Sequence, residues 1–488
     1  MMSNRPRNII LIMADNHPAN LLGCYGNTEV HTPNIDRLAQ QSVQFNHAYC
    51  VNAMCSPCRA SVLTGQMPSQ HGIHTWIDDR KMETWPDNWN ALTEITTLPE
   101  LLAEQGYDTA LIGKYHLGDP SKAQNGFNHW VTFPHGHTRS FWGNTVIENG
   151  TRSVYEGHIV DFFAEKAVDY LNDDARQDNP FFLFLPFNSP YGHWPSIKGE
   201  AQNRFAHLYA DCPCKTAPRE GISKAVIDRY MLRVNESGDG LDYSAVMRIP
   251  NDLPSIRNYF SQMSMLDDAV GRVLGAMEAN GLADDTVVVY TCDHGFSLGH
   301  HGFWGHAQAT WPSNAHGAGY HIPLLISGSD CVSRQTDNLI SQVDLFPTLL
   351  GVAGIADVPE NAGRDMSGVL ADERPDVWDE VVYIEQEETR AVRTDKWLYM
   401  KRFQGNARFE LMDELYDLNA DPNERNNLAG DNRYVATVAM LDGILTDFFE
   451  QHSDPKFDLW RGGVAKSNSD KPWFWQGAWG EEWAAIFS

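Results

Sequence analysis

Short apolar runs bounded by turn residues alternate with amphipathic stretches along most of the chain. We expect strands at residues 8–13, 109–112, 181–185, 286–291 and 322–327. We expect helices at residues 35–41, 98–104, 160–171, 256–277 and 343–350. Continuous apolar runs of this length are typical of parallel strands that are buried on both faces. The pattern therefore predicts an α/β fold, in which helices sandwich a mainly parallel sheet and active-site loops lie at the carboxyl ends of the strands.

The pattern changes near residue 375. The segments VVYIEQ, RAVRTDKWLYMK and ELYDL are typical of antiparallel strands, and a helix is expected at 434–451. We therefore predict a catalytic α/β domain at 1–375 and a smaller C-terminal α+β subdomain, with an antiparallel sheet, at 376–488. The subdomain ends in an aromatic tail with tryptophans at 473, 475, 479 and 483, which must pack against something and is a candidate contact in a homo-oligomer.

Charge and cysteine content restrict the partners and the compartment. With 37 Lys and Arg against 64 Asp and Glu, the formal charge is 37 − 64 = −27, which disfavours a nucleic-acid partner. No apolar run is long enough to span a membrane. Eight cysteines in 488 residues are too few for a disulfide scaffold. Since no export signal is recognisable before NIILIMAD, we expect a cytoplasmic location, unless such a signal has been removed.

The strongest local motif is CSPCRASVLTG, which begins at Cys55. Taken alone, Cys55 and Cys58 could be a redox pair, half of a zinc site, or buried structural cysteines. A zinc site needs a second ligand pair, and Cys212 and Cys214 have the wrong spacing. The whole run resembles the sulfatase signature C-x-P-x-R followed by A-S-x-L-T-G, in which the cysteine is oxidised to formylglycine. Because this signature varies at the position of Cys58, we expect that residue to be dispensable.

Further segments carry the same resemblance in the same order. NIILIMAD is similar to the family's first strand, GKYHLG to G-K-W-H-L-G, TCDHGFSLGHHGFWGH to T-S-D-H-G-E-x-L-G-D-H-G-L-W-G-K, and ELYDLNADPNERNNLA to the family's C-terminal motif. The chain thus resembles the type I formylglycine-dependent sulfatases of the alkaline phosphatase superfamily. The resemblance implies an alkaline-phosphatase-like α/β fold, one divalent metal that is usually calcium, and a formylglycine-generating enzyme as maturation partner.

Two carboxylates are the candidate core of a metal site. Asp15 and Asp293 each end a predicted strand, and Asn16 and His294 follow them directly. Asp15 alone could equally cap a turn or a helix. Together these residues, with the matured hydroxyl of residue 55, suit a hard cation that polarises a sulfate ester. The resemblance implies Ca²⁺. Mn²⁺ or Mg²⁺ are alternatives, because Asn16 replaces a family carboxylate and the nitrogen of His294 can coordinate a softer metal such as manganese.

Cationic and donor groups are needed around the sulfuryl oxygens. Arg59 follows Cys55 by four residues, so on a helix it can hold a hydroxyl of residue 55. Lys114, His116 and His193 match family motifs or their context. We expect His193 or Lys114 to donate a proton to the leaving alcohol and His116 to assist regeneration of the aldehyde.

His306 stands where the family has a sulfate-binding lysine. Histidine is a cation near neutrality only if the bound anion raises its pKa. The alternative is that His316 or His321 has taken over this contact, and the sequence leaves the choice open.

These residues predict a sulfatase that hydrolyses a small or oligosaccharide sulfate ester through formylglycine and one divalent metal. A phosphonate monoester or phosphodiester hydrolase of the same superfamily is the nearest alternative, and a non-catalytic protein that binds sulfated ligands is another. Several tryptophans are candidates for an exposed rim that stacks on sugar rings, with core packing as the alternative: 76, 85, 89, 130 and 142.

Overall fold

The computed structural model describes residues 7–77, 85–86, 88–173, 179–220, 245–306, 313–373, 378–404, 412–467 and 473–486. Its strands before the C-terminal part are β1 (Asn8–Asp15), β2 (Val43–Tyr49), β3 (Asp108–Ile112), β4 (His129–Thr132), β5 (Trp142–Glu148), β6 (Thr151–His158), β7 (Phe181–Pro190), β8 (Thr286–Cys292), β9 (Ser297–Leu298), β10 (Trp304–Gly305), β11 (His321–Ile322), β12 (Leu324–Ser327) and β13 (Arg334–Ser341). Its helices there are α1 (Pro33–Ala39), α2 (Cys55–Thr64), α3 (Pro68–His71), α4 (Leu98–Glu104), α5 (Ile159–Leu171), α7 (Ala245–Arg248), α8 (Leu253–Ala279), α9 (Gly317–Tyr320), α10 (Leu345–Val352) and α11 (Ser367–Leu370).

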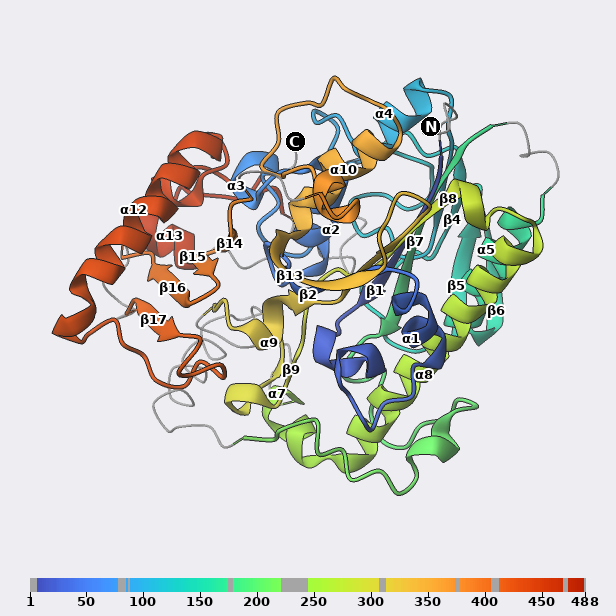
Figure 1. Cartoon of the computed structure of the whole chain (residues 1–488), viewed down its shortest axis with the longest axis horizontal. Coiled ribbons are helices and arrows are strands. Elements are labelled where there is room, and N and C mark those ends of the chain that lie inside the picture. Colours follow the sequence, from blue (N-terminus) through green and yellow to red (C-terminus); the bar gives the residue numbers. More distant parts are fainter. Residues whose placement is uncertain are drawn as a thin grey trace.

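A large mixed sheet forms the centre of the molecule. Its strand order is β11-β2-β12-β8-β1-β7-β3-β4-β5-β6, and β13 pairs with β2. The inner strands β8, β1, β7 and β3 run parallel, as the apolar runs predict. Helix α8 packs against both α5 and α1, and α2, α4 and α10 form a second group. In Figure 1, α5 and α8 lie side by side next to the sheet.

One strand expectation is wrong in direction. Residues 322–327 form β11 and β12, separated by Pro323, and β12 runs antiparallel to both β8 and β2. A strand that is buried on both faces has the same continuous apolar sequence in either direction, so the run could not reveal its orientation. The strands from β8 to β4 run parallel as expected, and antiparallel pairs flank them on both sides.

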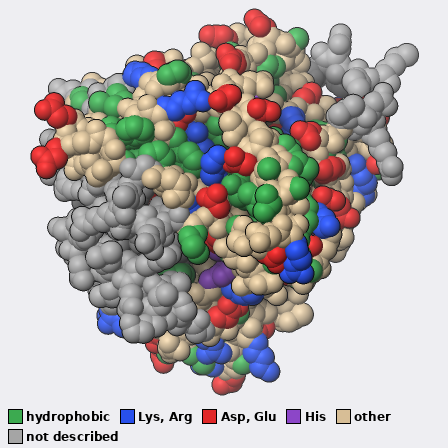
Figure 2. Space-filling view, turned by 90° about the vertical axis from the view of Figure 1, so that its left-hand side faces the viewer, with side chains coloured by type: hydrophobic (Ala, Val, Ile, Leu, Met, Phe, Trp, Pro, Cys, Tyr) green, Lys and Arg blue, Asp and Glu red, His purple; other side chains and the backbone are tan. Residues whose placement is uncertain are grey.

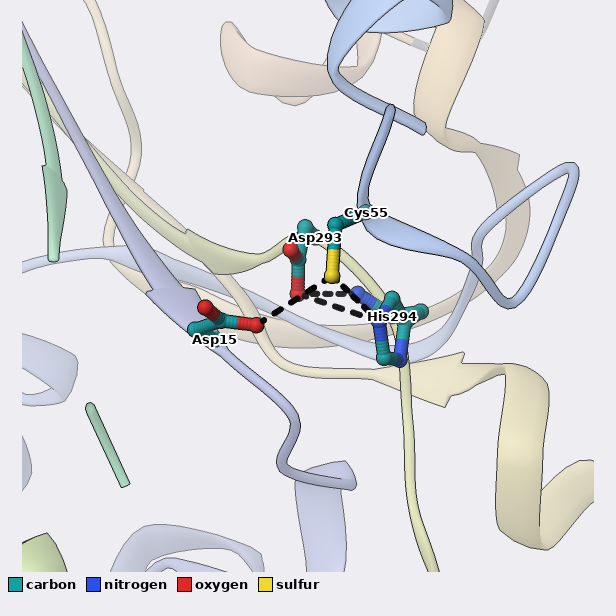
Figure 3. Close-up of side chains that lie close together, drawn as sticks. All are labelled: Asp15, Cys55, Asp293 and His294. Atoms are coloured by element: carbon teal, nitrogen blue, oxygen red, sulfur yellow. Dashed lines mark hydrogen bonds and ion pairs between the residues drawn. The ribbon is translucent and has the colours of Figure 1, made fainter. Parts of the chain in front are cut away.

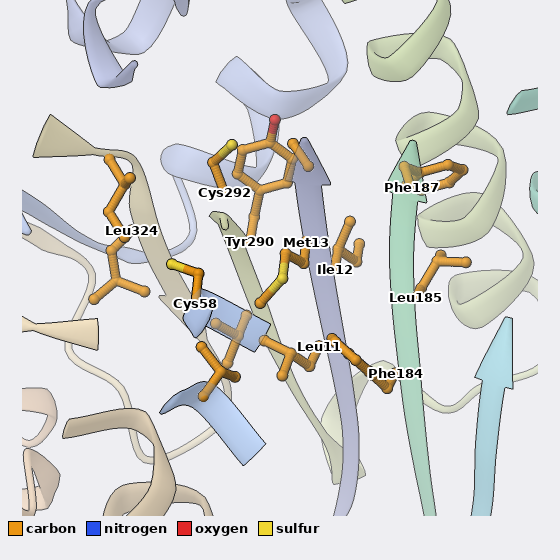
Figure 4. Packing of buried hydrophobic residues seen from close by; sticks show 14 of the residues in the cluster. Leu11, Ile12, Met13, Cys58, Phe184, Leu185, Phe187, Tyr290, Cys292 and Leu324 are labelled. Carbon is orange, nitrogen blue, oxygen red and sulfur yellow. The ribbon is translucent and has the colours of Figure 1, made fainter. Parts of the chain in front are cut away.

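The central strands are held by an extensive apolar core. Ile9 to Ala14 of β1 have no exposed surface, and they pack among β7, β8 and their neighbours. Figure 4 shows Leu11, Ile12 and Met13 between the side chains of the flanking strands, with Cys58 of α2 packed close by. This rigid centre fixes the strand ends that carry the candidate site.

The C-terminal part has its own antiparallel sheet, as expected. Strands β14 (Val381–Gln386), β15 (Thr389–Thr394), β16 (Trp397–Arg402) and β17 (Glu414–Asp417) pair in chain order. Helix α12 (Val435–His452) packs on β15 and β16. Figure 1 shows these elements in orange and red at one side of the main sheet. The boundary at 375/376 stays a prediction.

The aromatic tail packs within the molecule. Trp475 of helix α13 (Trp473–Trp479) and Trp483 join Phe403, Leu459 and Ala465 in a small separate cluster. The indole of Trp483 donates to Gly463 O at 2.7 Å. This packing accounts for two of the four tail tryptophans, whereas Trp479 is 41% exposed.

The molecular surface agrees with the charge of the sequence. On the face shown in Figure 2, acidic and basic side chains are interspersed, and the basic ones form no large continuous block. No helix in the described ranges is long and apolar enough to cross a membrane.

Candidate active site

The Cys55 side chain lies at the start of α2. Met54 precedes the helix in an extended conformation, and all residues from Cys55 to Thr64 are buried. Cys55 is therefore the first residue of a ten-residue helix, where free backbone N–H groups favour negative charge. Its Sγ lies 3.7 Å from Asp15 Oδ1 and 3.6 Å from His294 Nε2. Figure 3 shows the sulfur directed toward these groups and Asp293.

The candidate metal ligands meet because their strands are neighbours. β1 and β8 pair in parallel up to Ala14 and Cys292, so Asp15 and Asp293 follow adjacent strand ends. Ligand atoms of Asp15, Cys55, Asp293 and His294 all lie within 4.8 Å of one another. His294 Nδ1 donates to Gly295 O at 2.8 Å, which leaves the lone pair of Nε2 facing the cluster. Asp15, Asp293 and His294 thus offer oxygen and nitrogen donors to one ion, and the Cys55 sulfur stands where a hydroxyl of the matured residue would lie.

Asn16 adds an unsatisfied amide to this cluster. The side chain is fully buried, and neither Oδ1 nor Nδ2 has a hydrogen-bond partner among the described residues. Its backbone adopts a φ of 66°, and its N–H donates to Asp293 Oδ1 at 3.3 Å. A buried amide oxygen without a partner is costly unless something binds it. The donor set therefore fits a divalent cation.

Two buried cations hold the aspartates. Lys114 Nζ lies 2.7 Å from Asp15 Oδ2, and Arg59 donates to Asp293 Oδ2 at 2.9 Å. The other guanidinium arm of Arg59 donates to Lys114 O at 2.8 Å. Arg59 thus contacts the carboxylates of both Asp15 and Asp293, and its role in holding a hydroxyl of residue 55 stays a prediction.

Burial and charge set the protonation states here. Burial and the nearby Asp293 raise the pKa of Asp15, despite Lys114 and Arg59. Burial would also raise the pKa of Asp293, but His294, Arg59 and Lys114 together hold it below its ordinary value. The two carboxylates therefore repel each other, and a bound dication would relieve that repulsion.

The Cys55 thiol is not activated as a thiolate. Burial raises its pKa well above the ordinary value, although Lys114 opposes this. A protonated, buried thiol is a poor nucleophile and a poor redox group. All eight cysteines, each within a described range, are free, and Cys58 Sγ contacts Asp293 O and Gln342 instead of Cys55. The geometry does not support the redox interpretation.

Three imidazoles line one wall of the cluster. The ring of His306 lies 4.2 Å from that of His294 and 5.0 Å from that of His193. His306 Nδ1 also bonds Ala53 O, next to the nucleophile segment. Burial and its two neighbours hold the pKa of His306 well below its usual range, and burial lowers that of His193 to about 3. Both rings are therefore neutral in the ligand-free chain.

The other two candidates for the family lysine lie elsewhere. His316 bonds Glu424, and His321 bonds Asn46 O and packs on Tyr49. Of the three histidines, the structure thus places His306 at the cluster.

His116 is held at a strained position in the wall. Its φ is 59°, its Nε2 bonds Ile77 O at 2.8 Å, and its ring lies 5.3 Å from that of His137. Gly136 leaves room for the ring, since a Cβ there would lie 2.0 Å from His116 Nε2. The role of His116 in aldehyde regeneration stays a prediction.

Sequence reasoning missed three contributors. Gln342 donates to the carbonyls of Cys292 and Asp293 at 2.9 and 3.0 Å, and the ring of Tyr191 lies 5.3 Å below Lys114 Nζ. His137 packs against Trp76 and His116. Tyr191 directly follows β7, so its position at a strand end could have identified it as a site residue. No comparable sequence feature marks Gln342.

The expected tryptophan rim is mostly wrong. Trp130 and Trp89 are buried in the core, and Trp142 lies on β5 with 44% exposure. Trp76 and Trp85 pack partly buried against the core. Burying a large aromatic side chain removes much apolar area from water, which favours packing in the core over exposure at a rim.

Comparisons with known proteins agree with this geometry. A family model described as sulfatase matches residues 7–355, and a model described as the C-terminal part of N-sulphoglucosamine sulphohydrolase matches residues 314–451. The chain is 28% identical to an N-acetylglucosamine-6-O-sulfatase of Bacteroides thetaiotaomicron, over 93% of this chain and 88% of that protein. It is 30% identical to the iduronate 2-sulfatase of Homo sapiens, over 71% of this chain and 69% of that protein.

A solved structure has the same fold. It is a protein in complex with its substrate D-glucosamine-2-N,6-O-disulfate, and it superposes with a TM-score of 0.71 at 24% identity. The match covers 92% of this chain and 98% of that one, so the fold is shared over nearly the whole length.

Proposed function

Because the chain belongs to the sulfatase family and hydrolyses sulfate esters, we propose that its substrate is a small or short saccharide sulfate and that a formylglycine at position 55 is the nucleophile. The observation that carries this proposal is the position of Cys55. Its Sγ faces both Asp15 and His294 at the start of a buried helix. A hydroxyl on the same Cβ would face the same groups.

The Cys55 thiol keeps its proton because burial raises its pKa, so the unmodified side chain would be a poor nucleophile. Conversion to formylglycine explains why this cysteine nevertheless occupies the nucleophile position. Oxidation of the Cys55 side chain to an aldehyde, followed by hydration, gives two hydroxyls on one carbon. One hydroxyl can attack sulfur and break its bond to the alcohol, which leaves with a proton while the sulfate stays on residue 55. Loss of the proton from the other hydroxyl can then expel sulfate and restore the aldehyde. The maturation enzyme that this requires is a further part of the proposal.

We infer a divalent cation held by Asp15, Asn16, Asp293 and His294, together with residue 55. When bound, it would polarise the sulfuryl oxygens and favour ionisation of a hydroxyl at residue 55. The buried, unpartnered amide oxygen of Asn16 supports this assignment. Three oxygen-bearing side chains and one imidazole are compatible with Ca²⁺, with Mn²⁺ or Mg²⁺ as the alternatives.

Residues of the chain position the reacting groups. Arg59 and Lys114 fix the aspartate carboxylates and supply positive charge near the sulfuryl oxygens. Burial lowers the pKa of Lys114, but Asp15 and Cys55 raise it more, so its ammonium keeps its proton. Lys114 can thus donate a proton at neutral pH, whereas His193 becomes a donor only if a bound anion raises its pKa.

The saccharide assignment rests on the relatives and on charge. The two similar proteins named above are called N-acetylglucosamine-6-O-sulfatase and iduronate 2-sulfatase. A chain of net charge −27 repels a heavily sulfated polymer at long range, which favours a monosaccharide or short oligosaccharide. The free state of all eight cysteines supports a reducing, cytoplasmic location, which we also propose.

A substrate panel tests the proposal. Sulfate, phosphate and phosphonate esters of one alcohol should be compared, together with sulfated monosaccharides, short oligosaccharides and a matching polymer at low and moderate salt. We expect the sulfate ester to react fastest and the short saccharides to exceed the polymer. Faster turnover of the phosphonate would favour the hydrolase alternative, and fastest turnover of the polymer at low salt would contradict the charge argument.

A further inference from the structure

A second group of metal-binding side chains lies apart from the nucleophile. His301, His316 and Glu424 come from three separate segments, and their ligand atoms all lie within 4.8 Å of one another. Among the described residues, only this group and the cluster around Cys55 meet that criterion. None of its members has a role in the proposed reaction, so the group needs its own explanation.

The backbone holds two of the three residues in unfavourable conformations. His301 and Glu424 have φ values of 55° and 57°, in the left-handed region that favours glycine. The His301 N–H donates to Glu220 Oε2 at 3.0 Å, and the Glu424 N–H donates to Asp421 O at 3.0 Å. Such conformations persist where surrounding structure imposes them, and they are concentrated at functional positions.

One ligand pair is already close to coordination spacing. His316 Nδ1 and Glu424 Oε2 are hydrogen-bonded at 3.0 Å. Donors that bind one tetrahedral Zn²⁺ at about 2.0–2.2 Å lie about 3.3–3.6 Å apart, so this pair would have to separate by only a few tenths of an ångström. The ring of His301 stacks on that of His316, with centroids 3.9 Å apart and an angle of 23° between the planes. A lone pair lies in its ring plane, so the His301 side chain must turn out of the stack to reach the same ion.

Neighbouring groups orient the ligands. Arg393 donates to Glu424 Oε1 at 2.8 Å and the Gly317 N–H donates to Oε2 at 2.9 Å, which fixes the carboxylate. The other nitrogen of His316 lies 3.8 Å from Glu414 Oε2. A metal-bound histidine commonly directs its second nitrogen at a carboxylate, and this arrangement has that form.

We propose that His301, His316 and Glu424 bind a divalent transition-metal ion, and that Zn²⁺ fits best. Two imidazoles and one carboxylate are a known ligand set for zinc, with a water completing the tetrahedron. Here two of the three protein ligands are imidazole nitrogens, unlike the first site with its three oxygen-bearing side chains, and a mainly nitrogen donor set disfavours Ca²⁺ and Mg²⁺, which prefer oxygen. The proposal does not depend on the proposed function, since it uses no residue of that site.

The ion would join two parts of the chain. His301 lies in the turn that leads to β10 and then to His306. Glu424 follows β17 of the C-terminal sheet. Bound metal would therefore fasten the loop that carries His306 to the C-terminal subdomain and stabilise both.

Zinc binding to the whole protein tests this proposal. Equilibrium dialysis with Zn²⁺ and elemental analysis should be done on wild type, His316→Gln and His301→Gln, with His321→Gln as the matched control outside the group. We expect wild type and His321→Gln to bind one zinc more than the other two variants. Affinity at this site should fall at least ~10²-fold in His316→Gln, since even outer-shell changes cost 10- to 100-fold.

Two further measurements separate this site from the first. In an Asp293→Asn background, which removes a proposed ligand of the other metal, the His316-dependent zinc should remain. Co²⁺ in wild type should give the intense visible absorption of a four-coordinate site, and His316→Gln should lose that band. Equal zinc content and affinity in wild type, His301→Gln and His316→Gln, or an unchanged Co²⁺ band in His316→Gln, would overturn the proposal, whatever happens to turnover.

Discussion

The Lys114 ammonium lies 2.7 Å from Asp15 Oδ2, and both side chains are fully buried. Lys114→Met would leave Asp15 with only the more distant Arg59, whose guanidinium lies 3.8 Å away. We expect turnover to fall at least ~10²-fold, the size of effect seen when one preorganised donor is lost. Steady-state kinetics on a small sulfate ester would measure this. Lys198→Met, at an exposed lysine over Trp194, is the control, and an equal loss there would point to a general effect.

Asp293 is held by Arg59 and adjoins Asp15, His294 and Cys55. Asp293→Asn removes one of the two carboxylates that would balance a dication. We expect loss of the metal that supports turnover and a fall in turnover well beyond ~10²-fold. Elemental analysis and kinetics on the same preparation check this together. Normal turnover in a variant without that metal would refute the ligand assignment.

Cys58 is more constrained than the variability of the signature suggests. It is fully buried, it contacts the carbonyl of Asp293, and its Sγ lies 2.7 Å from Gln342 Oε1. We expect Cys58→Ser to keep turnover near wild type, because a hydroxyl can donate to the same carbonyl. Cys58→Leu should overpack the site, lower the free energy of unfolding by about 1–3 kcal/mol and displace Asp293. Thermal unfolding and kinetics distinguish the two variants, and full activity in Cys58→Leu would show that the contact is dispensable.

The buried ion pair of Glu424 and Arg393 gives a pH-dependent prediction. Burial alone would raise the pKa of Glu424, but Arg393 and His316 lower it from 4.5 to about 2. Because the folded value is depressed, ionised Glu424 stabilises the fold fully above pH 4.5, and this stabilisation is lost as the pH falls toward 2. Glu424→Gln should therefore lower the free energy of unfolding by about 3–5 kcal/mol at pH 7.

The difference in the free energy of unfolding between Glu424→Gln and wild type should shrink as the pH falls below 4.5. Denaturant unfolding at pH 7 and pH 3.5, with a chelator present, measures it. Glu450→Gln, which breaks an exposed pair with Arg461, should cost no more than about 1 kcal/mol at either pH. If the loss of unfolding free energy in Glu424→Gln is the same at both pH values, the assigned pKa of Glu424 is wrong.

The local pattern of the sequence predicted the central strands and most helices well. Residues 98–104 form α4 and residues 160–171 fall within α5, because turn residues and apolar period mark them clearly. Strand β2, the hairpin of β5 and β6, and the direction of β12 were missed. β2, β5 and β6 contain polar residues and so lack a continuous apolar run, and strand direction depends on long-range pairing.

The residues of the site could be predicted where a polar or charged side chain lies directly at a strand end or within a family motif. Asp15 and Asp293 could be placed together because parallel neighbours end at one edge of a sheet. The contact of His306 with His294 and the clamp by Gln342 depend on loop packing, which residue spacing does not encode.

The central claim is that Cys55 acts after conversion to formylglycine. The most direct measurement is peptide mass spectrometry across Cys55 on protein made with a formylglycine-generating enzyme, paired with sulfatase turnover of the same sample. We predict that the peptide carries the mass of an aldehyde in place of the thiol, that turnover scales with the modified fraction, and that Cys55→Ala has none. Fully active protein with an unmodified Cys55 thiol would contradict the account.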